Sequence, residues 1–307
     1  MIVLEFKLKG KAQQYRIIDE MIRTAQFVRN KTLRHWIDNQ GVKLVDLYKQ
    51  CAIMASEFEW AGKLNSMARQ ASAERAIFAI QRFFSNCKTK KPGKKGYPQF
   101  KKHTRSVEYK TSGWSLSTDK RCLTFTDDFA AGTFRLLGSR DLHFYAPGEI
   151  KRIRVIRRAD GYYAQFCINV ERTEETIPTG KAVGLDVGLN HFYTDSAGAT
   201  VPNPRHLRKT EKALKRLQKR VSRKKKGSGN RKKAINKLGR KHLKVSRQRK
   251  DFAIKTALCV VKSSDFVAYE NLQVRNMVKN HKLAKSISDA AWSQTRSLFA
   301  ILWKSVR

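Results

Sequence analysis

Acidic residues are scarce in this sequence of 307 residues: 25 Asp and Glu face 65 Lys and Arg, which gives a formal net charge of +40. An excess of one sign opposes compaction through self-repulsion, and a bound polyanion would remove that penalty. Surfaces that only promote solubility mix both signs, so the composition favours a nucleic-acid-binding protein over an ordinary metabolic enzyme. Hydrophobic residues still make up 41%, which excludes global disorder.

Cysteine pairs and long apolar runs are also missing. The five cysteines lie far apart and form no CxxC pair, which argues against a disulfide framework, indicates a reducing compartment and leaves the sequence without a zinc ribbon. No run reaches the roughly 18 apolar residues of a membrane span, and charged residues interrupt the apolar N-terminal stretch. We therefore expect a cytoplasmic protein with neither a membrane span nor a signal peptide.

Apolar spacing in the first half predicts a strand, a helical insertion and then further strands. Residues 2–8 alternate as a strand does, and helical periodicity follows over 13–37, 43–60 and 63–86. Short strands are predicted at 123–125, 134–136, 142–144, 153–156 and 162–170, the last two joined by a turn at residues 159–161. These strands predict a small β-barrel, which the strand at 2–8 closes across the helical insertion.

Two strongly apolar strands in the second half each carry one carboxylate, Asp186 in Gly184-Leu-Asp-Val-Gly-Leu189 and Glu270 at the end of Phe266-Val-Ala-Tyr-Glu270. An unpaired carboxylate inside an apolar strand is costly unless a cation or donors meet it. If the two strands are neighbours, both acids can bind Mg²⁺, and a two-metal site suits phosphodiester hydrolysis. The alternative for Asp186 is an acid at a turn or strand end. Ser288 or Asp289 is expected to cap the helix that begins there.

Most of the positive charge falls in two segments. Residues 205–250 contain 22 Lys and Arg and one acid, and they keep a helical apolar period with a break at Gly227-Ser-Gly-Asn230. This pattern predicts a cationic helical hairpin that faces a polyanion, with a solvated tail as the alternative. Residues 86–110 contain nine Lys and Arg and one acid, interleaved with Pro and Gly, and are expected to form a basic loop.

The order of these motifs resembles TnpB, the transposon-encoded RNA-guided nuclease family related to type V CRISPR effectors. In the second half the resemblance rests on the motif around Asp186, the basic hairpin, Arg249-Lys-Asp-Phe252, Tyr269-Glu-Asn-Leu272 and Ser286-Ile-Ser-Asp-Ala-Ala-Trp292. In the first half it rests on Phe27-Val-Arg-Asn30, Phe83-Phe84 and Gly96-Tyr-Pro-Gln-Phe-Lys101. It covers essentially the whole sequence in one order.

The resemblance implies an α+β multidomain fold. Residues 1–10 and 87–178 would form a wedge β-barrel domain, and residues 11–86 a helical recognition domain inserted in it. Residues 179–307 would form a partial RuvC nuclease domain of RNase H-like α/β fold, incomplete at its C-terminus and containing the basic hairpin 205–250. Protein oligomerisation is not implied.

The resemblance also implies a function. The family binds a guide RNA derived from the transposon end, recognises a short motif beside the target in double-stranded DNA, and cuts the DNA at a two-metal Mg²⁺ site. Asp186 and Glu270 match the first two RuvC carboxylates. Such a protein would work in the prokaryotic cytoplasm, on the DNA of the nucleoid.

Family members continue with a zinc ribbon and a third carboxylate, and this sequence contains neither. We therefore expect it to be a portion of a longer protein, with Zn²⁺ bound only in a ribbon outside this sequence; a naturally truncated product is the alternative. We expect little or no cleavage by the 307 residues alone. A nuclease-deficient, RNA-guided DNA-binding repressor is the alternative, and a basic nucleic-acid protein without guide or catalysis is a third hypothesis.

Position within the family assigns roles in binding. Reading of the target-adjacent motif falls to Ser66, Met67, Gln70, Thr111 and Ser112, since Gln can pair bidentately with adenine and Thr or Ser can reach a base edge. The alternative for each is an ordinary surface residue. Contacts with guide RNA or the guide–target duplex are assigned to Lys94, Lys95, Lys101, Arg208, Lys212, Arg216, Lys219, Arg220, Arg223, Lys232, Lys241 and Arg249.

Overall fold

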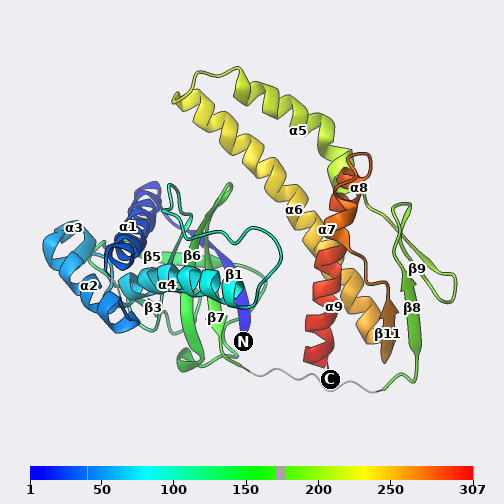
Figure 1. Ribbon diagram of the computed structural model, residues 1–307, viewed down its shortest axis with the longest axis horizontal. Helices are drawn as coiled ribbons and strands as arrows, with labels where there is room; N and C mark the ends of the chain where they lie inside the picture. The colour runs from blue at the N-terminus through cyan, green and yellow to red at the C-terminus, as the bar shows by residue number, and fades with distance from the viewer. Residues whose placement is uncertain (40, 171–177, 307) are drawn as a thin grey trace. The chain divides into compact units, whose positions relative to one another are not determined.

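The computed structural model describes residues 1–39, 41–170 and 178–306, and the chain falls into two compact units, Met1–Glu171 and Arg172–Arg307 (Figure 1). The domain boundary predicted at 178/179 adjoins residues 171–177, which lie outside the described residues. Among the described residues, no helix is long and apolar enough to cross a membrane.

The first unit contains a curled antiparallel sheet of seven strands in the order β2-β6-β7-β1-β5-β4-β3. The strands are β1 (Ile2–Lys9), β2 (Ser106–Tyr109), β3 (Trp114–Leu116), β4 (Cys122–Phe125), β5 (Gly132–Leu137), β6 (Ile150–Arg158) and β7 (Gly161–Ile168). As predicted, β1 joins strands that follow the helical insertion, because it pairs with β7 on one side and β5 on the other. β2 and β3 are the end strands of this order, so closure into a barrel stays a prediction.

Four helices are inserted between β1 and β2: α1 (Ala12–Asp38), α2 (Leu44–Glu57), α3 (Glu59–Gly62) and α4 (Ser66–Lys88). The first half of α1 packs Ile18 and Met21 into the core of the sheet. Its second half packs Val28 and Leu33 into a separate core with α2 and α4. One helix therefore belongs to both cores and joins the sheet and the helices into a compact unit, whose finer division into two domains stays a prediction.

Three predicted elements of this unit were wrong in whole or in part. The loop predicted over 86–110 is shorter at both ends, because α4 runs to Lys88 and β2 forms at Ser106–Tyr109. No strand forms at 142–144, where Leu142 is buried in a turn-rich segment before the short 3-10 helix η1 (Pro147–Glu149). Three alternating residues are too short a pattern to separate a strand from a turn that buries one side chain. The helix predicted over 43–60 ends at Glu57, because Phe58 adopts an extended conformation and α3 starts after it.

The second unit contains a mixed sheet in the order β10-β9-β8-β11, made of β8 (Ala182–Asp186), β9 (His191–Asp195), β10 (Thr200–Pro202) and β11 (Phe266–Tyr269). The basic hairpin, α5 (His206–Ser222) and α6 (Gly229–Ser263), connects β10 to β11. Its break at residues 223–228 overlaps the predicted break at 227–230 and begins four residues earlier. The helices α7 (Val274–Met277), α8 (Ala284–Ala290) and α9 (Trp292–Val306) follow. The C-terminal part of α6 packs Ala257 and Val260 against Leu185 of β8 and Phe299 of α9.

Candidate functional site

Parallel pairing of β8 with β11 brings the two predicted carboxylates to one edge of the second sheet. The register aligns Leu185 with Tyr269, so Asp186 and Glu270, each one residue further, leave the sheet side by side. The condition set from the sequence, that the two strands be neighbours, is therefore met. The 79 residues between these strands include the whole basic hairpin.

The expected burial of Asp186 is wrong. The strand predicted through Leu189 ends at Asp186, whose side chain is exposed, and Glu270 is exposed as well. The apolar residues after Asp186 turn toward β9, so the carboxylate lies at a strand end, as the alternative for this residue proposed. Neither acid therefore carries the cost of a charge inside an apolar strand, and both are open to a ligand from solvent.

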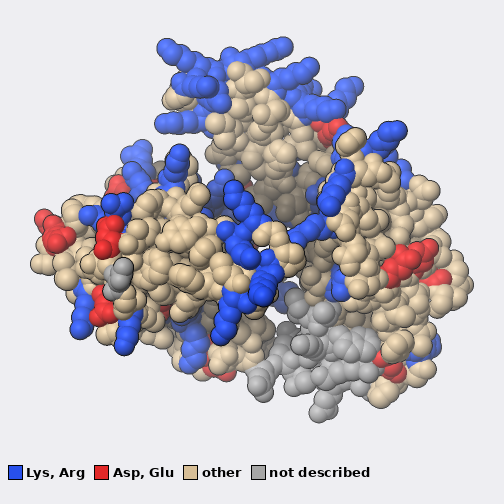
Figure 2. All heavy atoms as spheres, viewed as in Figure 1, with Lys and Arg blue, Asp and Glu red and all other residues tan. Residues whose placement is uncertain are grey.

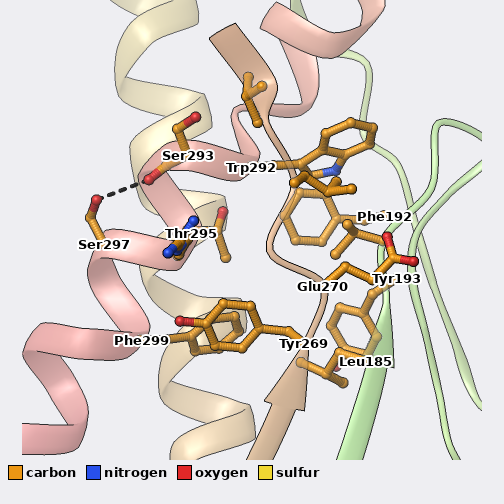
Figure 3. A pocket seen from close by; sticks show the side chains of 14 residues that line it. Leu185, Phe192, Tyr193, Tyr269, Glu270, Trp292, Ser293, Thr295, Ser297 and Phe299 are labelled. Carbon is orange, nitrogen blue, oxygen red and sulfur yellow. Dashed lines mark hydrogen bonds between the residues drawn. The ribbon is translucent and has the colours of Figure 1, made fainter. Parts of the chain in front are cut away.

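A pocket of about 280 Å³ lies beside Glu270, with aromatic, aliphatic and polar side chains in its wall. Figure 3 shows the Glu270 side chain on the side of the pocket formed by Phe192 and Tyr193. On another side, Tyr269 and Phe299 stack with their ring centroids 5.6 Å apart. Among the described residues that line this pocket, Glu270 is the only acid.

The donor chemistry of the two carboxylates fits a hard divalent cation. Mg²⁺ takes oxygen ligands and keeps several of its waters, so two exposed carboxylates at adjacent strand ends can hold one hydrated ion. Within the described part of the chain, no group of three or more His, Cys, Asp or Glu side chains could hold a metal ion. The donors therefore fit one hydrated ion, and the two-metal site predicted from the family stays a prediction.

Asp289 does not cap its own helix as expected. It lies near the end of α8, is 8% exposed, and accepts hydrogen bonds from the backbone N–H groups of Leu207 (2.9 Å) and Arg208 (3.2 Å) in the first turn of α5. It also forms an ion pair with Arg249 of α6 at 2.8 Å. One buried carboxylate thus caps α5 and ties α6 to α8. The guanidinium of Arg249, assigned to nucleic acid, is already engaged, and its binding role stays a prediction.

The remaining cations of the hairpin point outward. Figure 2 shows Lys and Arg side chains projecting from the α5–α6 hairpin at the top of the view. The apolar stripe of the hairpin, Leu214, Val221 and Val245, is buried. Lys241 is partly exposed, and the other basic residues assigned to binding on this hairpin, apart from Arg249, are exposed: Arg208, Lys212, Arg216, Lys219, Arg220, Arg223 and Lys232.

In the first unit, the residues assigned to motif reading come together between the start of α4 and the turn from β2 to β3. The hydroxyl of Thr111 lies 3.2 Å from the Met67 sulfur, and the Ser112 hydroxyl donates to Asn65 Oδ1 at 3.3 Å. Gln70 Oε1 accepts from Lys110 Nζ at 3.4 Å. Ser66, the first residue of α4, is exposed beside them. Contact with DNA stays a prediction.

Sequence reasoning missed Asn65 and Lys110, the residues that hold this patch together. Asn65 is the N-cap of α4 and accepts from the Met67 N–H at 2.9 Å, a role that an Asn before a helical period signals. Gly113 fixes the facing turn: its φ is +88°, and a Cβ there would lie 2.7 Å from Asn65. Lys110 forms an ion pair with the buried Glu74 at 2.6 Å, which no local pattern reveals.

Comparison with known proteins identifies proteins that are similar to this chain. Residues 165–281 match the OrfB_IS605 family, described as "Probable transposase". A "Putative RNA-guided DNA endonuclease" of Streptomyces pristinaespiralis is 33% identical over 82% of this chain, and the chain spans 61% of its length. The "Putative RNA-guided DNA endonuclease InsQ" of Escherichia coli K12 is 25% identical over 98% of the chain, which spans 77% of that protein.

Among solved structures, a chain of a CRISPR-Cas12f ternary complex aligns with 94% of this chain, which spans 70% of that chain. Its sequence identity is 14% and the TM-score is 0.34, too low to argue from. The family match and the curated relatives confirm the resemblance predicted from the sequence: the chain is similar to a transposase family over residues 165–281 and to putative RNA-guided DNA endonucleases over most of its length.

Proposed function

We propose that this chain is the nucleic-acid-binding and partial catalytic portion of an RNA-guided DNA endonuclease of the TnpB type. The observation that carries the proposal is the parallel pairing of β8 and β11, which places Asp186 and Glu270 at one sheet edge. The cationic α5–α6 hairpin lies between these two strands in the chain. A duplex bound along the hairpin would therefore be held by the same unit that carries the two carboxylates.

Guide–target base pairing would read most of the sequence, while the protein grips backbone phosphates and duplex shape. Exposed Lys and Arg on α5 and α6 suit that role, as do Lys94, Lys95 and Lys101 in the first unit. The short motif beside the target would be read by side chains at base edges. Gln70 on α4 accepts a hydrogen bond from Lys110, and Thr111 in the β2–β3 turn contacts Met67 on α4, so both would serve at the same surface. The place of action would be the cytoplasm, on nucleoid DNA.

Asp186 and Glu270 would hold Mg²⁺, which stabilises the attacking and leaving oxygens of phosphodiester hydrolysis when it is bound. We expect the 307-residue chain to cut guide-matched DNA little or not at all in Mg²⁺, because the described residues supply only two carboxylates at this edge. A cleavage assay on a supercoiled target checks this. Robust cutting that is lost in Asp186→Ala would contradict the expected inactivity while locating the active site.

Sequencing of the RNA that co-purifies with the chain tests the function itself. One dominant species that ends in a variable guide segment is the expected result. A heterogeneous mixture would overturn the proposal in favour of a basic nucleic-acid protein without a guide. The alternative, a nuclease-deficient repressor, predicts the same dominant guide RNA. It would be supported if the full-length protein bound guide-matched DNA without cutting it.

The hairpin makes a quantitative prediction about RNA affinity. Replacing Arg216, Lys219 and Arg223 together by Gln should weaken binding about 100-fold near 0.15 M salt and reduce the slope of log affinity against log salt by roughly 2–3, since each phosphate contact releases counterions. Filter binding over a salt series measures both quantities. The matched control removes the same number of cations, Lys215, Lys255 and Lys285, which are already paired with Glu211 or Asp251. An equal loss in the control would show that only total charge matters.

A further inference from the structure

The basic segment after α4 is held along α1 by two amide side chains one helical turn apart. Asn30 Nδ2 donates to the Lys101 carbonyl and Asn30 Oδ1 accepts from the Lys101 N–H, both at 2.9 Å. Gln26 does the same with Lys102 (3.1 Å) and Thr104 (2.7 Å). Figure 1 shows this segment leaving the end of α4 and returning alongside α1. The segment was predicted as a loop, and these four hydrogen bonds fix its backbone through both N–H and C=O groups, as pairing with a strand would.

An aromatic row lies where this segment meets α1 and α4, formed by Trp36, Phe84, Phe83 and Tyr97. Successive ring centroids are 6.1, 5.3 and 5.2 Å apart. Phe84 is 51% exposed and Tyr97 46% exposed, so the row presents ring surface to solvent. Large apolar side chains that remain exposed side by side mark a binding surface more often than chance.

The charge around the aromatic row selects the kind of partner. The segment 88–105 carries eight Lys and Arg and no acid, and all eight are exposed: Lys88, Lys90, Lys91, Lys94, Lys95, Lys101, Lys102 and Arg105. Lysine is depleted in protein–protein interfaces, whereas a surface that binds single-stranded nucleic acid combines basic side chains with aromatic rings on which bases stack. A duplex buries its base faces and gains nothing from such rings.

We propose that the aromatic row and its surrounding lysines bind unpaired nucleotides of RNA, and that Gln26 and Asn30 are positioning residues that keep the surface in shape. The rings would stack on the bases while the lysines contact the phosphates. This inference deepens the proposed function, and it rests on that function for the choice of RNA as the nucleic acid. It gives the motifs Phe27-Val-Arg-Asn30 and Gly96-Tyr-Pro-Gln-Phe-Lys101 one joint role.

The test measures binding of the full chain to a short single-stranded RNA and to an RNA duplex of the same sequence, at raised salt that weakens the phosphate contacts of the α5–α6 hairpin. The double variant Phe84→Leu, Tyr97→Leu should lose about tenfold or more in affinity for the single strand and less than about twofold for the duplex. Tyr97→Phe keeps a stacking ring and should bind as the parent does. Phe144→Leu, which removes a ring that is 84% exposed outside the row, serves as the control.

Equal losses for single strand and duplex, or no loss, would overturn the inference, and tighter binding of single-stranded DNA than of RNA would overturn the choice of RNA. Asn30→Ala should reproduce the single-strand defect and add little to the double Leu variant, whereas additive losses would refute a positioning role. Thermal unfolding checks that each variant is folded. If one guide RNA dominated the co-purified RNA but the aromatic-row variants bound single strands normally, this inference would be refuted and the proposed function would stand. If the co-purified RNA were heterogeneous but the aromatic-row variants were defective, the guide would be refuted and this inference would stand.

Discussion

Replacing Asp289 by alanine is expected to destabilise the second unit by about 3–5 kcal/mol, because it leaves a buried guanidinium without its partner. Arg249 donates to Asp289 through Nε at 2.9 Å, and its side chain is only 22% exposed. The same substitution removes the acceptor for two backbone N–H groups in the first turn of α5, where Arg205 at the N-cap position provides no side-chain hydrogen bond. Urea unfolding of the full chain measures the loss of stability.

Amide hydrogen exchange separates the two parts of this effect. Asp289→Asn keeps an acceptor for the first turn of α5 but loses the ion pair, so it should retain slow exchange at Leu207 and Arg208 while still losing stability. The matched control is Asp251→Ala on α6, which breaks an exposed pair with Lys255 and should cost less than about 1 kcal/mol. If Asp289→Ala behaved like Asp251→Ala, the buried carboxylate would not be what anchors the hairpin.

The second large effect is expected at Glu108, which is 4% exposed in β2. Its carboxylate pairs with Arg75 (3.2 Å), Arg152 (2.8 Å) and Arg154 (2.7 Å), so it links α4 to β6. Glu108→Ala should cost about 3–5 kcal/mol of unfolding free energy in the first unit, since three cations lose their common partner. Asp38→Ala, which breaks an exposed pair with Arg34 on α1, is the control and should cost less than about 1 kcal/mol.

The same carboxylate should make the stability of the first unit depend on acid. Burial on its own would raise the pKa of Glu108, but the hydrogen bond from Arg152 and the charges of Arg75 and Arg154 outweigh it and lower the pKa to about 2, from an ordinary value of 4.5. A lowered pKa stabilises the folded state at pH values above 4.5, and that contribution is lost as the pH falls from 4.5 toward 2. The thermal unfolding temperature should therefore fall less steeply between pH 4.5 and pH 2 in Glu108→Gln than in the parent protein. Parallel curves of unfolding temperature against pH would contradict the role of this charge.

The sequence predicted those features that depend on short-range pattern. Apolar runs located β8 and β11, the Gly-rich break located the turn between α5 and α6, and helical period located α1 and α4. The pairing of β8 with β11 could be stated only as a condition for the metal site and was not itself predicted, because register depends on contacts between segments 79 residues apart. Asp289 was misassigned for the same reason: its partners at 207, 208 and 249 are distant in sequence, while a local cap is the only role that local pattern can suggest.

The exposure of Asp186 could not be predicted from the apolar pattern around it either. The run that contains Asp186 is apolar on both sides of the acid, which predicts burial, but the strand ends at this residue and the following residues turn away. The motif-reading patch could be named from the resemblance to a family, yet its internal contacts through Asn65 and Lys110 came only from the packing of α4 against the turn after β2. The candidate residues could thus be named from the sequence, but the backbone geometry that brings them together could not be predicted.

The central position of β1 has a consequence for the order in which the chain folds. Ile2 pairs with Ile168 and Lys7 pairs with both Leu137 and Tyr163, so β1 finds its partners only after most of the first unit has been synthesised. Pairing over such sequence separations is slow, and until then both edges of β1 are open to other strands. The helical insertion has a local core of its own, so it can form before the remaining strands are synthesised.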